Sequence, residues 1–133
     1  MVVLGRPRAA HVAQELGVGR WIAAQPPHGR HLAPVWVVAA VGTTSGAHRP
    51  VGSRVDYLAS YQTLPGAQFD ERLLLQNWVD GLAQPDAETV TRLLDELDVR
   101  TVCVRTGTSD GLLPADVWDR VTRHGAFTCH QRP

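Results

Sequence analysis

The chain has 133 residues, a length that suits one domain with a single core, so we expect a single domain over residues 1–133. Its 13 basic and 13 acidic side chains are interspersed and cancel to a net charge of zero, which argues against nucleic acid as a partner and favours self-association into a homo-oligomer. All 13 basic residues are arginine, so the chain lacks the lysine that a Walker phosphate loop or a pyridoxal phosphate enzyme requires.

The first third of the chain predicts one helix and one central strand. Residues 2–5 form a short apolar run that suits a first strand or an extended lead-in. Apolar residues recur at roughly the helical period over residues 9–24, and two consecutive prolines then close the segment. Residues 35–41 are apolar on both faces and rich in β-branched side chains, which predicts a strand buried on both sides. Residues 42–53 hold glycine, proline and hydroxyl residues and predict a loop.

The middle of the chain contains the clearest helix signal. Residues 57–64 suit a strand or an irregular segment, and residues 73–79 predict another apolar strand. Asp86 is a good N-cap, and apolar residues then follow at the spacing of one helix face up to residue 97. Leu93 and Leu94 lie on or beside that face, so we expect at least one of them to be fully buried.

The last third predicts a strand, a helix and a final short strand. Residues 99–105 alternate between apolar and polar and indicate a strand. Residues 114–124 suit a third helix, with proline in the first turn, acidic residues near its start, basic residues near its end and Gly125 as the C-cap. Residues 126–130 suit a short strand that brings Cys129 near Cys103. Strands alternating with helices predict an α/β fold, a small sandwich with a central, partly parallel sheet built from βαβ units.

Two loops of similar composition are the candidate ligand-binding site. Each places glycine, threonine and serine just past an apolar segment, and parallel strands would bring both loops to the carboxyl edge of the sheet. Backbone amides, hydroxyl groups and two arginines there would suit an anion, with Gly46 and Gly111 lining a common crevice. The alternative is that these residue types are only what turns require. The candidate residues are Gly42, Thr43, Thr44, Ser45, Gly46, Arg49, Arg105, Gly107, Thr108, Ser109, Asp110 and Gly111.

Metal and nucleophile chemistry have weaker support. The six histidines and two cysteines show neither a catalytic nor a structural zinc spacing, so we predict no metal and no cofactor. Ser45 or Ser109 with His48 and Asp110 would supply a nucleophile, base and acid, but without the Gly-x-Ser-x-Gly elbow. All four tryptophans have apolar neighbours, which predicts that they anchor the core.

The apolar segments and the cysteines predict the surroundings of the protein. The longest apolar run covers about ten residues, half of what a bilayer span needs, so we expect no membrane insertion. The N-terminal residues lack the apolar core of a secretory signal, which predicts a soluble, cytoplasmic protein. Cys103 and Cys129 are then expected to be buried thiols, and whether they pair stays open. The lack of lysine is typical of a GC-rich, bacterial genome.

Residues 57–105 resemble the soluble domain at the C-terminus of actinobacterial multi-pass membrane glycosyltransferases. The resemblance rests on Glu71-Arg72-Leu73-Leu74 with Trp78, on the helix of residues 86–97 and on the strand of residues 99–104. It implies a relative of that domain and assigns no catalytic residue, because that family's chemistry resides in its membrane portion.

Two functions therefore remain open for the chain. The first is a non-catalytic α/β binding or accessory domain that recognises a small polar or anionic ligand, or a protein partner, through residues 42–53 and 106–113. The second is a small transferase or hydrolase that acts on a phosphorylated or sugar substrate through the same loops.

Overall fold

A mixed β-sheet forms the centre of the computed structural model, which describes residues 5–52, 69–108 and 110–133. Within these residues the strand order is β2-β1-β3-β5-β4. Strand β1 pairs in parallel with β2 and β3, while β5 pairs antiparallel with β3 and β4. The expected α/β fold with a partly parallel sheet is confirmed. The strands are β1 (Arg30–Leu32), β2 (Arg49–Pro50), β3 (Val99–Arg105), β4 (Arg120–His124) and β5 (Phe127–Gln131).

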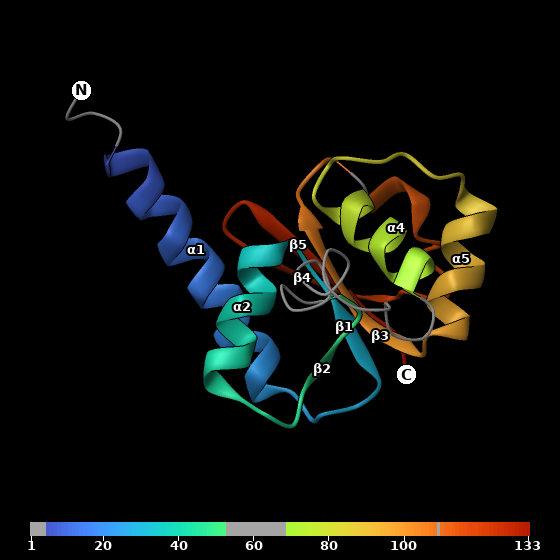
Figure 1. The fold of residues 1–133 in the computed structure, drawn as a ribbon, viewed down its shortest axis with the longest axis horizontal. Coiled ribbons are helices and arrows are strands. Elements are labelled where there is room, and N and C mark those ends of the chain that lie inside the picture. Colours follow the sequence, from blue (N-terminus) through green and yellow to red (C-terminus); the bar gives the residue numbers. More distant parts are fainter. Residues whose placement is uncertain (1–4, 53–68, 109) are drawn as a thin grey trace.

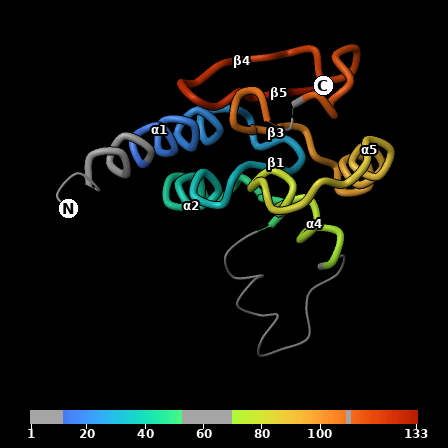
Figure 2. The backbone as a smooth tube through the Cα atoms, turned by 90° about the horizontal axis from the view of Figure 1, so that it is seen from above, coloured from blue at the N-terminus to red at the C-terminus, as the bar shows by residue number. Residues whose placement is uncertain are grey.

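Two pairs of helices cover the two faces of this sheet. Figure 2 views the sheet edge-on, with α1 and α2 on one side and α4 and α5 on the other. Strand β1, helix α2 and strand β2 form a βαβ unit, and the N-terminal part of α1 extends away from the sheet (Figure 1). The helices are α1 (Gly5–Ala24), α2 (Val35–Thr44), α4 (Phe69–Val79) and α5 (Ala87–Glu96), and a short 3₁₀ turn, η2 (Asp110–Leu112), follows β3.

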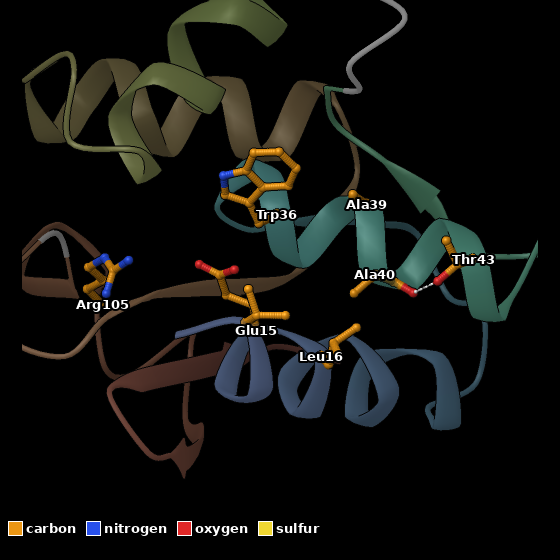
Figure 3. Close-up of a pocket in the computed structure, with 8 residues that line it drawn as sticks. Glu15, Leu16, Trp36, Ala39, Ala40, Thr43 and Arg105 are labelled. Atoms are coloured by element: carbon orange, nitrogen blue, oxygen red, sulfur yellow. Dashed lines mark hydrogen bonds between the residues drawn. The ribbon is translucent and has the colours of Figure 1, made fainter. Parts of the chain in front are cut away.

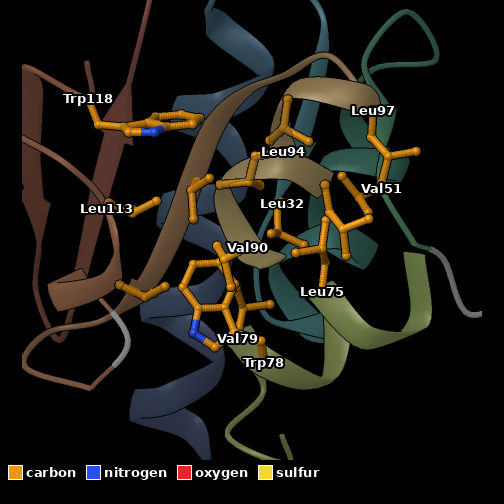
Figure 4. Close-up of a cluster of buried hydrophobic side chains, with 14 residues drawn as sticks. Leu32, Val51, Leu75, Trp78, Val79, Val90, Leu94, Leu97, Leu113 and Trp118 are labelled. Atoms are coloured by element: carbon orange, nitrogen blue, oxygen red, sulfur yellow. The ribbon is translucent and has the colours of Figure 1, made fainter. Parts of the chain in front are cut away.

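Each face of the sheet has its own apolar core. The larger core lies under α4 and α5 and includes Leu75, Leu93, Val102 and Trp118 (Figure 4). The smaller core lies under α1 and α2, where Val18 and Val37 pack with the two cysteines of β3 and β5. Cys103 and Cys129 lie directly opposite each other in the β3–β5 ladder and form a disulfide bond, so they are not free thiols.

The strand predicted for residues 35–41 is wrong, because this segment is helix α2. A short run that is apolar on both faces fits a buried helix as well as a buried strand, and its alanines favour the helix. The first amide of α2 is satisfied from outside: the backbone N–H of Val35 donates to Asp80 Oδ1 at 3.0 Å. Pro34 at the N-cap has no side-chain acceptor, so Asp80, 45 residues away in the sequence, takes over the capping role.

Two further segments also differ from the expectation. Residues 73–79 belong to helix α4 rather than to a strand. Residues 114–124 form a turn followed by strand β4 rather than a helix, and Gly125 adopts φ 60° in the hairpin turn between β4 and β5. A turn at positive φ requires glycine as much as a helix C-cap does, so this glycine did not distinguish the two structures.

Several predicted elements are confirmed. Residues 9–24 lie within α1, strand β3 covers residues 99–105, and β5 covers most of residues 126–130. The Asp86 side chain accepts a hydrogen bond from the Thr89 backbone N–H at 2.7 Å and caps α5. Leu93 and Leu94 are both buried. The first strand or lead-in expected at residues 2–5 and the element at residues 57–64 fall on residues 1–4 and 53–68, outside the described residues, except for Gly5, which begins α1. Among the described helices, none is both long and apolar enough to cross a membrane.

Candidate functional site

A groove of about 570 Å³ runs along the seam between α1 and α2. Helix α1 contributes Val12, Glu15 and Leu16 at the i, i+3, i+4 spacing of one helix face. Helix α2 contributes Trp36, Ala39 and Thr43 at the i, i+3, i+7 spacing, together with Ala40. Arg105, the last residue of β3, also lines it. The groove is therefore an apolar trough with charged groups, of the kind that binds small amphipathic molecules.

Trp36 is the largest apolar surface in this groove. Trp36 is 57% exposed, whereas the buried tryptophans Trp78 and Trp118 are 2% and 3% exposed. Figure 3 shows its indole above the groove, on the α2 side. The prediction that all four tryptophans anchor the core is therefore wrong for Trp36, since helix periodicity turns it away from Val37 and Val38, which are buried. Had residues 35–44 been recognised as a helix, this spacing would have revealed the exposed stripe.

Two opposite charges lie in the groove without neutralising each other through an ion pair. Arg105 and Glu15 form no ion pair with any described residue, and Figure 3 shows the Glu15 carboxylate between Arg105 and Trp36. The guanidinium of Arg105 lies 5.2 Å from the centroid of the Phe127 ring, which holds its stem against the sheet. Its N–H donors thus stay available to an anion beside an aromatic surface.

The structure brings Thr43 from the first predicted loop and Arg105 from the second into this one groove. The Thr43 hydroxyl donates to the Ala40 carbonyl at 2.8 Å, so it keeps only acceptor capacity for a ligand. Gly42 and Thr44 belong to the last turn of α2, and the Thr44 hydroxyl also donates to Ala40. Arg49 lies exposed in β2, away from the groove.

The second predicted loop adds no other wall to the groove. Gly107 takes φ 84° in the turn after β3, and the Thr108 hydroxyl donates to the Arg105 carbonyl at 2.7 Å. Asp110 and Gly111 belong to η2, and Ser109 lies outside the described residues. Gly107, Thr108, Asp110 and Gly111 therefore serve as turn residues.

The predicted crevice between Gly46 and Gly111 does not form the groove. Its premise was a strand at residues 35–41, and that segment is a helix. Because β1, β2 and β3 run parallel, the loop that leads into the start of β2 lies at the opposite sheet edge from the turn that follows β3. Neither Gly46 nor Gly111 lines the α1–α2 groove.

Ser45 and His48 form a second polar arrangement, just past the end of α2. The His48 Nε2 lies 2.7 Å from the Gln25 carbonyl oxygen, which can only accept, so this nitrogen carries the proton. The Nδ1 of His48 then accepts from the Ser45 hydroxyl at 2.6 Å. A serine that donates to an oriented histidine is the geometry of an activated nucleophile. The same bonds also tie the end of α1 to the loop after α2.

Comparison of the chain with protein-family models, with curated proteins and with solved structures finds no match. The resemblance to glycosyltransferase C-terminal domains therefore stays a prediction. Among the described residues, no cluster of three or more histidine, cysteine, aspartate or glutamate side chains is placed to hold a metal ion. The functional argument consequently rests on the groove and its chemistry.

Proposed function

We propose that the chain is a non-catalytic binding domain that recognises a small amphipathic anion in the α1–α2 groove. The observation that supports this most is that Trp36 and Arg105 line one groove. The exposed indole offers a stacking surface, the guanidinium offers bidentate donors for a carboxylate, sulfonate or phosphate, and Leu16 supplies an apolar wall. Glu15 adds an acceptor for a hydroxyl or amine of the ligand.

A pair of fluorescent probes tests both halves of this chemistry. Anilinonaphthalene sulfonate combines fused aromatic rings with an anion, and N-phenyl-1-naphthylamine has the same rings without the charge. We expect Trp36→Ala to weaken the binding of both probes. Arg105→Gln should weaken only the binding of the sulfonate, by roughly fivefold, because it removes a partly exposed charged hydrogen bond. Fluorescence titration of the folded protein measures both affinities.

Arg20→Gln is the matched control, because Arg20 is exposed on α1 and lies outside the groove wall. Circular dichroism must show that each variant keeps its fold, since the sulfonate probe also binds partly unfolded chains. Equal sulfonate affinity in wild type, Arg105→Gln and Arg20→Gln would contradict the proposal.

The hydrolase alternative draws support from the Ser45–His48 hydrogen bond. The binding function is better supported, because this pair follows the C-terminal end of α2, where helix carbonyls disfavour a developing oxyanion. Turnover of p-nitrophenyl acetate that disappears in Ser45→Ala would favour the hydrolase.

The compartment belongs to the same proposal. The sequence predicted a cytoplasmic protein, whereas a disulfide is typical of oxidising compartments such as the periplasm or the cell exterior. The disulfide between Cys103 and Cys129 is fully buried between adjacent strands, where it forms part of the core. We therefore propose that the domain functions in an oxidising compartment. Alkylation of thiols in cell extracts under non-reducing conditions tests this: labelled cysteines in unfolded protein would contradict it.

A further inference from the structure

A row of polar side chains crosses four strands on the sheet face that α1 and α2 cover. Strand register places Arg120 of β4 opposite Gln131 of β5, Gln131 opposite Thr101 of β3, and Thr101 opposite His31 of β1. The Gln131 amide donates to the Thr101 hydroxyl at 3.4 Å, which confirms that these two side chains share a face. The next row on this face contains the disulfide of Cys103 and Cys129.

The outer part of this row is left uncovered because α1 ends at Ala24. Beyond it lies a cavity of about 600 Å³, at the opposite end of β3 from Arg105. The turn after α1 forms one wall, and the sheet and the C-terminal residues form the others. The lining residues are Gln25, Pro26, His28, Arg100, Thr101, Asp119, Arg120, Gln131, Arg132 and Pro133.

Three arginines line this cavity, and they differ in how many donors remain available. Arg132 is the most engaged: each of its three side-chain nitrogens donates one hydrogen bond, to Asp95 and to the carbonyls of Leu94 and Val99, and its guanidinium stacks on Trp118. Arg100 donates to Asp98 and to the Pro133 carbonyl and retains part of its fork.

The side chain of Arg120 has no hydrogen bond or ion pair with any residue in the described part of the chain. Both aspartates that pair with Arg100 and Arg132 are exposed and lie outside the cavity wall. Arg120 is therefore the arginine whose whole fork can meet a ligand.

We propose that this cavity binds the phosphate monoester of a small hydroxylated molecule, as a second site distinct from the α1–α2 groove. A dianionic phosphate accepts bidentate hydrogen bonds from Arg120 and a further one from Arg100, and the Gln131 amide and Thr101 hydroxyl lie in the row beside them. Asp119 contributes a carboxylate side chain to the wall, which repels the phosphate but accepts from a hydroxyl of the attached group. This combination selects a phosphorylated polyol over a simple anion.

Isothermal titration with inorganic phosphate and with glucose 6-phosphate tests the site. We expect Arg120→Gln to weaken both ligands by about tenfold, as the loss of a bidentate charged contact does. Arg123→Gln is the matched control, since Arg123 is exposed on the same strand at a position that alternation turns to the other face. It should leave both affinities unchanged. Arg105→Gln should also leave them unchanged, so the experiment tests this site independently of the α1–α2 groove.

Asp119→Ala, which removes both the charge and the acceptor, separates the two parts of the ligand. Removing the like charge should raise the affinity for inorganic phosphate. Losing the acceptor for a hydroxyl should lower the affinity for glucose 6-phosphate relative to that for inorganic phosphate. The proposal is overturned if neither ligand binds the wild-type protein with a Kd below about 10 mM. It is also overturned if Arg120→Gln and Arg123→Gln have the same affinities, or if Asp119→Ala changes the affinities for both ligands equally.

Discussion

His31 is a titratable side chain buried in the first parallel strand. It is 4% exposed, and its Nε2 atom has no hydrogen-bond partner among the described residues. Burial, with a smaller contribution from the charge of nearby His48, lowers the pKa of His31 from 6.5 to about 4. A small cavity of about 10 Å³, lined by both histidines, lies beside it. The folded protein thus holds His31 neutral where the unfolded chain would protonate it.

This difference makes the free energy of unfolding depend on pH. Because the folded pKa of His31 lies below the unfolded one, the stabilisation is complete above pH 6.5 and is lost as the pH falls toward 4. We expect a loss of about 2 kcal/mol between pH 6.5 and 5, from about 1.4 kcal/mol per pH unit. Urea denaturation at several pH values measures it.

His31→Gln should flatten this dependence, while His28→Gln, at an exposed position, should keep it. Desolvation also lowers the pKa of His124, which packs against Trp21, so a shallower slope of the same sign remains in every variant. A wild-type slope equal to that of His31→Gln would show that His31 does not titrate abnormally.

At the scale of elements, the packing of α1 on α2 depends on one glycine. A Cβ atom added at Gly19 would lie 2.5 Å from the Ala40 Cβ, whereas one added at Gly17 meets nothing within 4 Å. Both glycines lie within α1. Gly19 thus permits a close approach of the two helices, and Gly17 has no such role.

The two glycine-to-alanine variants should therefore change stability in opposite directions. Gly19→Ala forces the helices apart and should lower the free energy of unfolding by about 1–3 kcal/mol. Gly17→Ala should raise it by up to about 1 kcal/mol, since alanine is the better helix former. Urea denaturation of both variants measures the difference. Equal effects would mean that the α1–α2 contact is not as close as described, and the groove between these helices would then be in doubt.

Sequence predicted those elements whose signal is local. Helix α5 has its own cap at Asp86 and an apolar face of regular spacing, and β3 alternates between polar boundaries. Helix α2 has neither signal: its run is apolar on both faces, and its first amide is satisfied by Asp80, which follows the end of α4. A cap supplied by a residue distant in the sequence gives no local signal, so the segment was predicted as a strand.

The site was predicted only in part for the same reason. Thr43 and Arg105 were among the predicted site residues. They were predicted because their loops were expected at the same edge of the sheet, and the two loops lie at opposite edges. Their actual connection is the seam between α1 and α2, which requires α2 to be a helix. Trp36 and Glu15 were missed because only that helix pairing turns them toward each other. The row that contains Arg120 depends on the register of strand β4. Sequence did not predict this strand, because the pattern of residues 114–124 is typical of a helix.

At the scale of the whole molecule, the disulfide joins the parallel and antiparallel parts of the sheet. Strand β3 pairs with β1 on one side and with β5 on the other, and Cys103–Cys129 links β3 to the β4–β5 hairpin across 26 residues of sequence. Both helices of one face pack over this link. The bond therefore constrains the C-terminal hairpin against β3, which pairs with the βαβ unit through β1.

Breaking this link should lower the stability of the whole domain. Closing a loop of this length restricts the unfolded chain by about 3–4 kcal/mol on a chain-entropy estimate. Because both sulfur atoms are fully buried, a reductant should act through the unfolded chain, and equilibrium urea denaturation with and without reductant should show a lower midpoint in the reduced sample. Cys103→Ala/Cys129→Ala should unfold at a midpoint near that of the reduced protein and should not respond to reductant. If reductant left the wild-type midpoint unchanged while alkylation showed both thiols free, the disulfide would not be what holds the hairpin to the rest of the sheet.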